Sequence, residues 1–221
     1  MSLVPSQTAR QEALMEFSAL GQANHCPLGM YIWPTEVFRW SGVLFIHQGY
    51  YASSVLHFTL SIPASYPSKP PSVTFDSPVF HPLVDPASGR MRLDARFPHW
   101  RPREDFIWSV LHFVKGAFKR RALDELREPV CANPEAYRLY RDQTPLFAQL
   151  AAQSAALSCS SSVLYAPPPS RSADPNPSAI RFKKLKGEEV DELRSELRTV
   201  GERKVVKKRT GTGTGTAGIA G

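Results

Sequence analysis

Three kinds of side chain near the middle of the chain could do chemistry. His81, next to a proline, could act as a general base, and Asp85 and Asp94, which flank a predicted turn, could form a carboxylate pair for acid–base catalysis. Cys131 precedes a helix start at Asn133, where the helix N-terminus would favour a thiolate nucleophile. No serine or cysteine adjoins His81, and turn formation explains Asp85. We therefore expect structural roles for His81 and Asp85 and an inert thiol at Cys131, with a Cys131 nucleophile as the alternative.

Cysteine usage and glycine patterns argue against a metal or a cofactor. The three cysteines, Cys26, Cys131 and Cys159, include no C-x-x-C pair, which favours reduced thiols in a cytosolic or nuclear setting over a disulfide framework or a zinc site. The Gly-Thr repeat near the C-terminus lacks the preceding strand and the following lysine of a phosphate-binding loop. We therefore expect no bound metal and no cofactor.

Basic charge is concentrated near the C-terminus. Residues 181–209 carry 11 basic and six acidic side chains, so most of the formal net charge of +7 lies there. This distribution argues against nucleic-acid binding by the preceding domain. The basic cluster at 203–209 could be a nuclear-import signal, a contact for anionic membranes or a solvated tail. No apolar run is long enough for a transmembrane helix.

The hydrophobic pattern predicts one α+β domain. Apolar residues at helical spacing indicate a helix over 7–20, and a stripe over 106–118 indicates a second one. Asn133 and Thr144 each precede a proline, a helix-start pattern that predicts helices over 134–140 and 144–156. Alternating β-branched and aromatic residues predict a four-stranded antiparallel meander with one wet face, which carries His57, Thr59 and Ser61. The expected strands are 30–34, 40–47, 55–62 and 72–75.

The remaining segments are read from composition. Residues 76–105 show no periodicity but contain aromatic residues that need burial, so we expect an ordered, functional loop. Val190, Leu193, Leu197 and Val200 form a two-heptad seam that could dock on a partner helix or pack on the domain. The predicted division is a flexible N-terminus (1–6), the folded domain (7–157), a Ser/Pro-rich linker (158–186), an amphipathic basic helix-prone tail (187–209) and a disordered Gly/Thr tail (210–221).

Several motifs, in order, resemble the ubiquitin-conjugating enzyme family. The stretch "YPSKPPSVTF" (66–75) is similar to the family's Tyr-Pro-x-x-Pro-Pro signature, and "VFHP" (79–82) to its His-Pro-Asn box. Trp100 with its following x-Pro and the stretch "NPEAYRLYRDQTPLFAQLA" (133–151) resemble later motifs. The resemblance spans about 7–156 and implies the fold of that family: an N-terminal helix, the meander sheet and C-terminal helices.

The resemblance also identifies two positions at which the family's chemistry is missing. The family holds ubiquitin on a cysteine in an Ile-Cys-Leu context, and here that context reads Met91-Arg92-Leu93. The family's asparagine after His-Pro is Leu83 here. Guanidinium is not a nucleophile, and leucine offers no donor to an oxyanion. The resemblance therefore implies a degenerate site at Arg92, Leu83 and His81 and no ubiquitin transfer by the usual route.

Within that family the chain is most similar to inactive variants of the fused-toes / Akt-interacting protein group, notably through "FHPLVDPASG" (80–89). This resemblance implies an adaptor that binds Hook-family coiled-coil proteins and their associated large subunit, with an Akt-type kinase and ubiquitin as further candidate partners. It implies a cytoplasmic location, with peripheral association with endosomal or other vesicle membranes. Alternatives are a ubiquitin-pathway cofactor that binds ubiquitin or an active conjugating enzyme, and an atypical transferase that uses Cys131. The candidate partner-binding residues are Tyr137, Tyr140, Phe147 and Leu150.

Overall fold

A computed structural model describes residues 7–165, 180 and 182–210, with side chains up to residue 198. The chain forms two compact units that divide after Ile180. The predicted tails at 1–6 and 211–221, and most of the predicted linker, lie outside the described residues. The predicted division into five segments therefore stays a prediction, although a short helix, α6 (Ser161–Leu164), lies inside the segment assigned to the linker.

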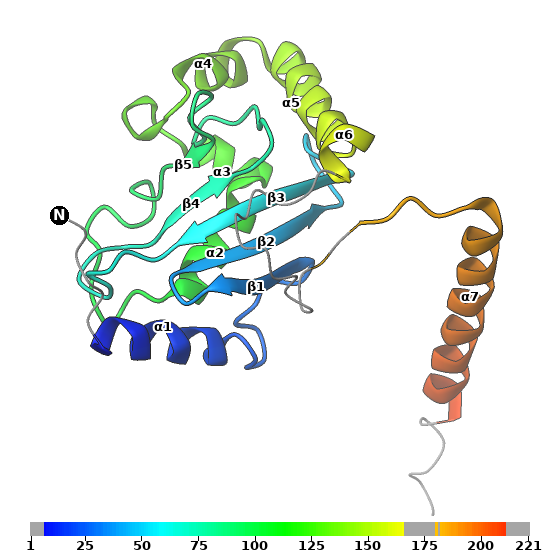
Figure 1. Cartoon of the computed structure of the whole chain (residues 1–221). Coiled ribbons are helices and arrows are strands. Elements are labelled where there is room, and N and C mark those ends of the chain that lie inside the picture. The colour runs from blue at the N-terminus through cyan, green and yellow to red at the C-terminus, as the bar shows by residue number, and fades with distance from the viewer. Residues whose placement is uncertain (1–6, 166–179, 181, 211–221) are drawn as a thin grey trace, which may run out of the picture. The chain divides into compact units, whose positions relative to one another are not determined.

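The first unit is built on an antiparallel meander in which each strand pairs with the next (Figure 1). A fifth strand, β5 (Arg90–Met91), adds to the four predicted ones by pairing with β4. The prediction missed it because two residues are too few to form an alternating pattern. The four predicted strands are β1 (Met30–Glu36), β2 (Arg39–Ile46), β3 (Ser54–Ser61) and β4 (Ser72–Phe75).

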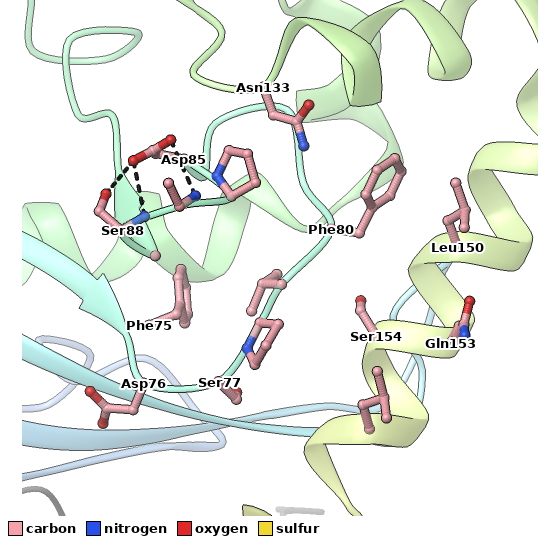
Figure 2. Close-up of a pocket in the computed structure, with 16 residues that line it drawn as sticks. Phe75, Asp76, Ser77, Phe80, Asp85, Ser88, Asn133, Leu150, Gln153 and Ser154 are labelled. Carbon is pink, nitrogen blue, oxygen red and sulfur yellow. Dashed lines mark hydrogen bonds between the residues drawn. The ribbon is translucent and has the colours of Figure 1, made fainter.

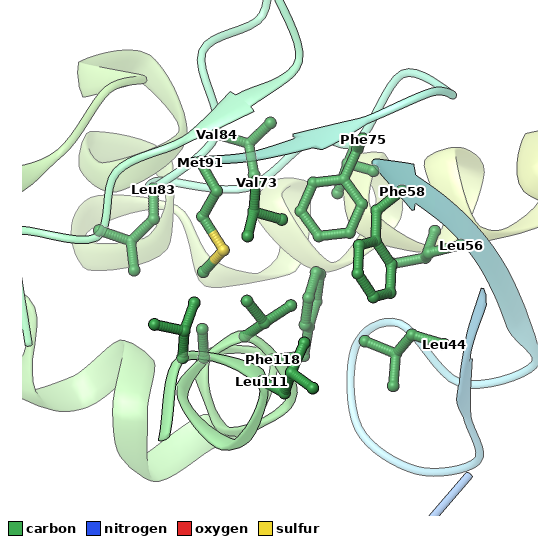
Figure 3. Packing of buried hydrophobic residues seen from close by; sticks show 14 of the residues in the cluster. Leu44, Leu56, Phe58, Val73, Phe75, Leu83, Val84, Met91, Leu111 and Phe118 are labelled. Atoms are coloured by element: carbon green, nitrogen blue, oxygen red, sulfur yellow. The ribbon is translucent and has the colours of Figure 1, made fainter. Parts of the chain in front are cut away.

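The main core lies between the sheet and α2 (Ile107–Ala117), whose predicted apolar stripe is buried as expected. Figure 3 shows side chains of the sheet meeting those of this helix and of the segment around Leu83. Gly42 permits the tight cross-strand packing, because a Cβ there would lie 2.4 Å from the ring of Phe58. Burial of this contiguous apolar cluster supplies the main stabilisation of the unit.

The face of the sheet opposite α2 is less solvated than predicted. Ser61 is exposed, but Thr59 is buried and donates its hydroxyl to a carboxylate oxygen of Asp76 at 3.2 Å. Val43 stands in register between Tyr31 and His57 on this face and is fully buried. The prediction of one wet face is thus wrong for part of the sheet, because a polar side chain such as Thr59 can be buried once its hydroxyl has a partner.

The helix α1 (Gln7–Ala19) turns a carboxylate, not only apolar side chains, toward the domain. Leu14 is 51% exposed, whereas Glu16 is buried. The Glu16 carboxylate accepts hydrogen bonds from the hydroxyl of Tyr66 and, at 3.1 Å, from the backbone N–H of Ile107, the first residue of α2. Glu16 therefore caps α2 from another helix, at the end where the helix dipole favours negative charge.

The C-terminal helices pack at the other end of the sheet, after a short helix α3 (Arg120–Glu125) and a 3₁₀ turn η1 (Glu128–Val130) that the sequence patterns did not indicate. The predicted starts of α4 (Pro134–Asp142) and α5 (Thr144–Ser158) are correct, and the side chain of Asn133 accepts from the N–H of Ala136 at 3.0 Å. Ser158 is fully buried and accepts from the N–H of Val55 at 3.0 Å. This bond fixes α5 against β3 and places Ser158 in the folded domain, not in the linker.

The second unit contains one described helix, α7 (Gly187–Thr210), where the heptad spacing indicates one. Its N-terminus is held by Glu189, which accepts from the N–H of Lys186 at 2.8 Å. Leu193 and Leu197 of the predicted seam are 42% and 70% exposed. The side chains of Val200 and of the basic cluster at 203–209 lie outside the described residues. Among the described helices, none is long and apolar enough to cross a lipid bilayer.

The role of Glu16 predicts a large loss of stability on truncation. Glu16→Ala should lower the free energy of unfolding by about 2–3 kcal/mol, because it leaves the buried Tyr66 hydroxyl and the Ile107 N–H without their acceptor. Glu12→Ala, one turn earlier on the same helix, should change it by less than about 0.5 kcal/mol. Urea titration followed by circular dichroism measures both. Equal effects of the two variants would contradict the capping role.

The same carboxylate predicts a pH dependence. Burial raises the pKa of Glu16 above its ordinary value of 4.5, against the opposing effects of its hydrogen bonds. At pH values between 4.5 and the raised pKa, the folded state binds more protons than the unfolded state. The stability that comes from protonated Glu16 is therefore complete below pH 4.5 and is lost as the pH rises through the raised pKa. Urea midpoints measured at a series of pH values report this dependence. Glu16→Gln should remove the fall of the midpoint with rising pH, and an unchanged fall would contradict the assignment of Glu16 as the titrating group.

Candidate functional site

The candidate site is a hairpin formed by residues 83–92. Its turn is closed by Asp85, whose carboxylate accepts hydrogen bonds from the N–H and hydroxyl of Ser88 and from the N–H of Ala87. These bonds, the Ser88 hydroxyl first, hold the pKa of Asp85 below its ordinary value. Gly89 has φ +69°, and a Cβ there would lie 2.4 Å from the carbonyl oxygen of Phe75, so the turn requires glycine. The turn returns the chain so that the N–H of Arg92 donates to the carbonyl of Leu83 at 2.8 Å.

Arg92 is held by its neighbours at three points. Its Nε donates to Asp94 Oδ1 at 3.0 Å, Nη2 donates to Asp94 Oδ2, and Nη1 donates to the backbone carbonyl of Pro129 at 3.1 Å. The hydrogen bonds that Arg92 donates to Asp94 are the main reason that the pKa of Arg92 is raised above its ordinary value. The side chain, 40% exposed, is therefore a fixed cation at the surface. The structure engages Asp85 and Asp94 with different partners instead of presenting them as a carboxylate pair.

The fold brings Cys131 near Arg92. The 3₁₀ turn η1 brings the carbonyl of Pro129 to Arg92 and places Cys131 immediately after it. The thiol is buried and donates to the carbonyl of Arg127 at 3.3 Å. Burial raises the pKa of Cys131 to about 11, although the positive charge of Arg92 lowers it. The sequence could not reveal this approach, because the short turn leaves no periodic signal.

Leu83 and His81 form the inner side of the site. Leu83 is 1% exposed and packs in the core with Met91 and Val84 (Figure 3). The fully buried His81 accepts the N–H of Leu83 on Nδ1 at 3.0 Å, so its proton lies on Nε2, which donates to the carbonyl of Ala117 at 3.1 Å. Burial lowers the pKa of His81 to about 4. The imidazole is therefore neutral at pH 7, with both nitrogens engaged in hydrogen bonds.

The predicted partner-binding residues divide into buried and accessible members. Phe147 is fully buried and Tyr140 is 6% exposed, because both belong to a cluster of aromatic rings with Tyr50. This placement argues against both as contact residues, because Phe147 is enclosed in the core and little of Tyr140 reaches the surface. Tyr137 and Leu150 are partly accessible. The candidate surface is therefore reduced to Tyr137 and Leu150.

Leu150 opens onto a groove that the sequence patterns did not indicate. The groove has a volume of about 490 Å³ and lies between the segment 75–89 and α5 (Figure 2). Phe80 contributes to its wall from the segment, and Leu150 and Leu157 contribute from α5. Ser77 lines it with a buried hydroxyl that has no hydrogen-bond partner among the described residues. Among those same residues, no three His, Cys, Asp or Glu side chains gather as a metal site would require.

Comparison with known proteins gives one family. A family model described as "Ubiquitin-conjugating enzyme" matches residues 15–155. AKT-interacting protein from Danio rerio is 41% identical over 122 residues, which cover 54% of this chain and 40% of that protein. The AKT-interacting proteins of Xenopus tropicalis and Homo sapiens are 39% identical over the same number of residues, again 40% of their length. The chain thus spans about 40% of the length of these relatives.

The thiol environments predict an order of chemical labelling. Iodoacetamide at pH 7.5 should modify the exposed Cys159 well before Cys131, because only a thiolate reacts and burial keeps Cys131 protonated. Arg92→Gln should slow Cys131 further, since it removes the charge that lowers the thiol pKa. Mass spectrometry of timed digests gives both rates. Two results would contradict this description. One is labelling of Cys131 before Cys159, and the other is faster labelling of Cys131 in an Arg92→Gln variant that remains folded.

Proposed function

Because the chain belongs to the ubiquitin-conjugating enzyme family, we propose that it is a non-catalytic member that acts as a protein-interaction scaffold. The observation that carries the proposal is the state of Arg92. This residue stands at the nucleophile position that the motifs assign, and its guanidinium is bound by Asp94 and the carbonyl of Pro129. A thioester requires a thiolate, which arginine does not supply.

The surroundings of Arg92 supply no substitute for the missing groups. Leu83, at the position of the family's asparagine, is apolar and buried, so it donates nothing to a developing oxyanion. His81 has no free nitrogen with which to take a proton. A pKa of about 11 leaves Cys131 ionised to only about one part in ten thousand at pH 7. Three separate requirements of ubiquitin transfer are thus unmet within one site.

A second proposal concerns the partners of the chain and its location in the cell. We propose that the chain is an adaptor subunit in Hook-containing complexes that move endosomal vesicles along microtubules, and that it works in the cytoplasm with peripheral association with vesicle membranes. The motif resemblance supports the Hook-family partners and their associated large subunit. The name of the relatives, AKT-interacting protein, supports an Akt-type kinase as a second partner.

A charging assay tests the absence of catalysis. The full chain incubated with activating enzyme, ubiquitin and ATP should give no reducible ubiquitin adduct on a non-reducing gel, because no described thiol near the site is ionised. An active conjugating enzyme in a parallel reaction shows that the assay works. A reducible adduct that disappears in Cys131→Ser would replace the scaffold proposal with an atypical transferase.

Co-elution tests the second proposal. Mixed with a purified full-length Hook-family protein, the full chain should elute with it in size-exclusion chromatography, and immobilised Akt-type kinase should retain the chain at physiological salt. Independent elution from the Hook-family protein would remove that partner and the trafficking role. Loss of kinase retention would remove only the kinase.

A further inference from the structure

We propose that the groove between the segment 75–89 and α5 binds an extended peptide segment of a partner protein that carries an aliphatic side chain next to a lysine or arginine. This inference rests on the proposed scaffold role and gives the chemistry of a partner for it. Four features of the groove support it: an apolar wall, free backbone groups, one hydroxyl without a hydrogen-bond partner, and negative charge.

The apolar wall fits one aliphatic side chain. Phe80 and Leu150 are partly accessible, and Leu157, at the end of α5, is 49% exposed (Figure 2). Because these three apolar side chains line one concave surface, they indicate a docking site better than a single exposed residue would. The volume of about 490 Å³ lies in the range of ligand pockets, but the open form suits a side chain and its backbone more than an enclosed small molecule.

The segment 76–80 offers backbone groups to such a peptide. The N–H of Asp76 donates to the carbonyl of His57 at 2.9 Å, and the carbonyl of Phe80 accepts from the hydroxyl of Tyr51 at 2.7 Å, so both ends are fixed. Between them, the N–H groups of Ser77 and Val79 have no backbone acceptor among the described residues. Unpaired backbone groups in a fixed segment beside a groove are groups to which a bound peptide can add main-chain hydrogen bonds.

Ser77 provides an independent sign of a missing ligand. It is only 4% exposed and lines the groove, yet its hydroxyl oxygen has no hydrogen-bond partner among the described residues. Buried hydroxyl groups in folded proteins are nearly always paired, because an unpaired one loses its hydration without compensation. A backbone group of a bound peptide would supply the partner.

The negative charge of the groove favours a basic residue next to the aliphatic residue of the bound peptide. Both ionisable side chains that line it, Asp76 and Asp85, are acidic. Asp85 is committed to its own turn, whereas Asp76 accepts only the Thr59 hydroxyl at 3.2 Å among the described side chains. Arg39 is near enough to influence Asp76 but does not line the groove. Asp76 is therefore the group that would favour a lysine or arginine of the peptide.

A random octapeptide library displayed on phage, selected against the full chain, tests the inference. The expected result is a consensus of one aliphatic residue next to lysine or arginine. Fluorescence anisotropy of the selected peptide, made synthetically, should then show a loss of affinity of about tenfold or more in Leu150→Glu, which puts a charge in the apolar wall. Leu146→Glu, on an exposed residue of the same helix that does not line the groove, is the matched control and should bind normally.

Two further variants separate binding from folding. Asp76→Asn should weaken the peptide about two- to fivefold at low salt and reduce the salt dependence, whereas the exposed Asp142→Asn should not. Ser77→Ala should weaken binding by a similar factor while leaving the urea midpoint unchanged or higher, because it removes an unpaired hydroxyl. Urea midpoints of all variants identify any that fail to fold.

Three results would overturn the inference: no enriched peptide, an acidic consensus, or a selected peptide that binds Leu150→Glu and Leu146→Glu equally. Each would leave the charging assay untouched, so the groove can fail while the non-catalytic scaffold stands. Conversely, a reducible adduct on Cys131 would end the scaffold proposal without changing the peptide measurements.

Discussion

The buried imidazole of His81 joins the loop that carries the candidate site to the central helix, and the arrangement of the site depends on it. Its Nδ1 accepts a hydrogen bond from the N–H of Leu83, and its Nε2–H donates a hydrogen bond to the carbonyl of Ala117, the last residue of α2. Leu83 in turn accepts the N–H of Arg92. A chain of three hydrogen bonds thus runs from the helix to Arg92. The side chain that most resembles a general base is used as a structural connection.

The long segment between β4 and α2 is ordered for the same kind of reason. Leu83, Val84 and Met91 are buried in the main core, and the indole N–H of Trp100 donates to the carbonyl of Pro67 at 2.8 Å. Near its end the carboxylate of Asp105 accepts the backbone N–H and the guanidinium of Arg101. These anchors replace regular secondary structure, so the segment can present the hairpin and one wall of the groove in fixed positions.

The sequence allowed the elements with strong periodic signals to be predicted, and the site only in part. The apolar stripe of α2 and the Asn-Pro start of α4 are local patterns, and both predictions are correct. Glu16 could not be predicted as buried, because its partners lie 50 and 91 residues away. The approach of Cys131 to Arg92 and the groove beside Leu150 depend on how separate segments pack, and such contacts leave no trace in local spacing. The motif resemblance identified Arg92, but only the fold shows what holds it.

The clamp on Arg92 couples two parts of the domain that are far apart along the chain. Its guanidinium ties the segment after β5 to the 3₁₀ turn through Asp94 and the carbonyl of Pro129. Replacing Arg92 by cysteine would leave Asp94 without its cation and the carbonyl of Pro129 without its donor, while Leu83 would still offer no side-chain amide. A thiol introduced at this position alone would therefore remove a brace without supplying an oxyanion donor.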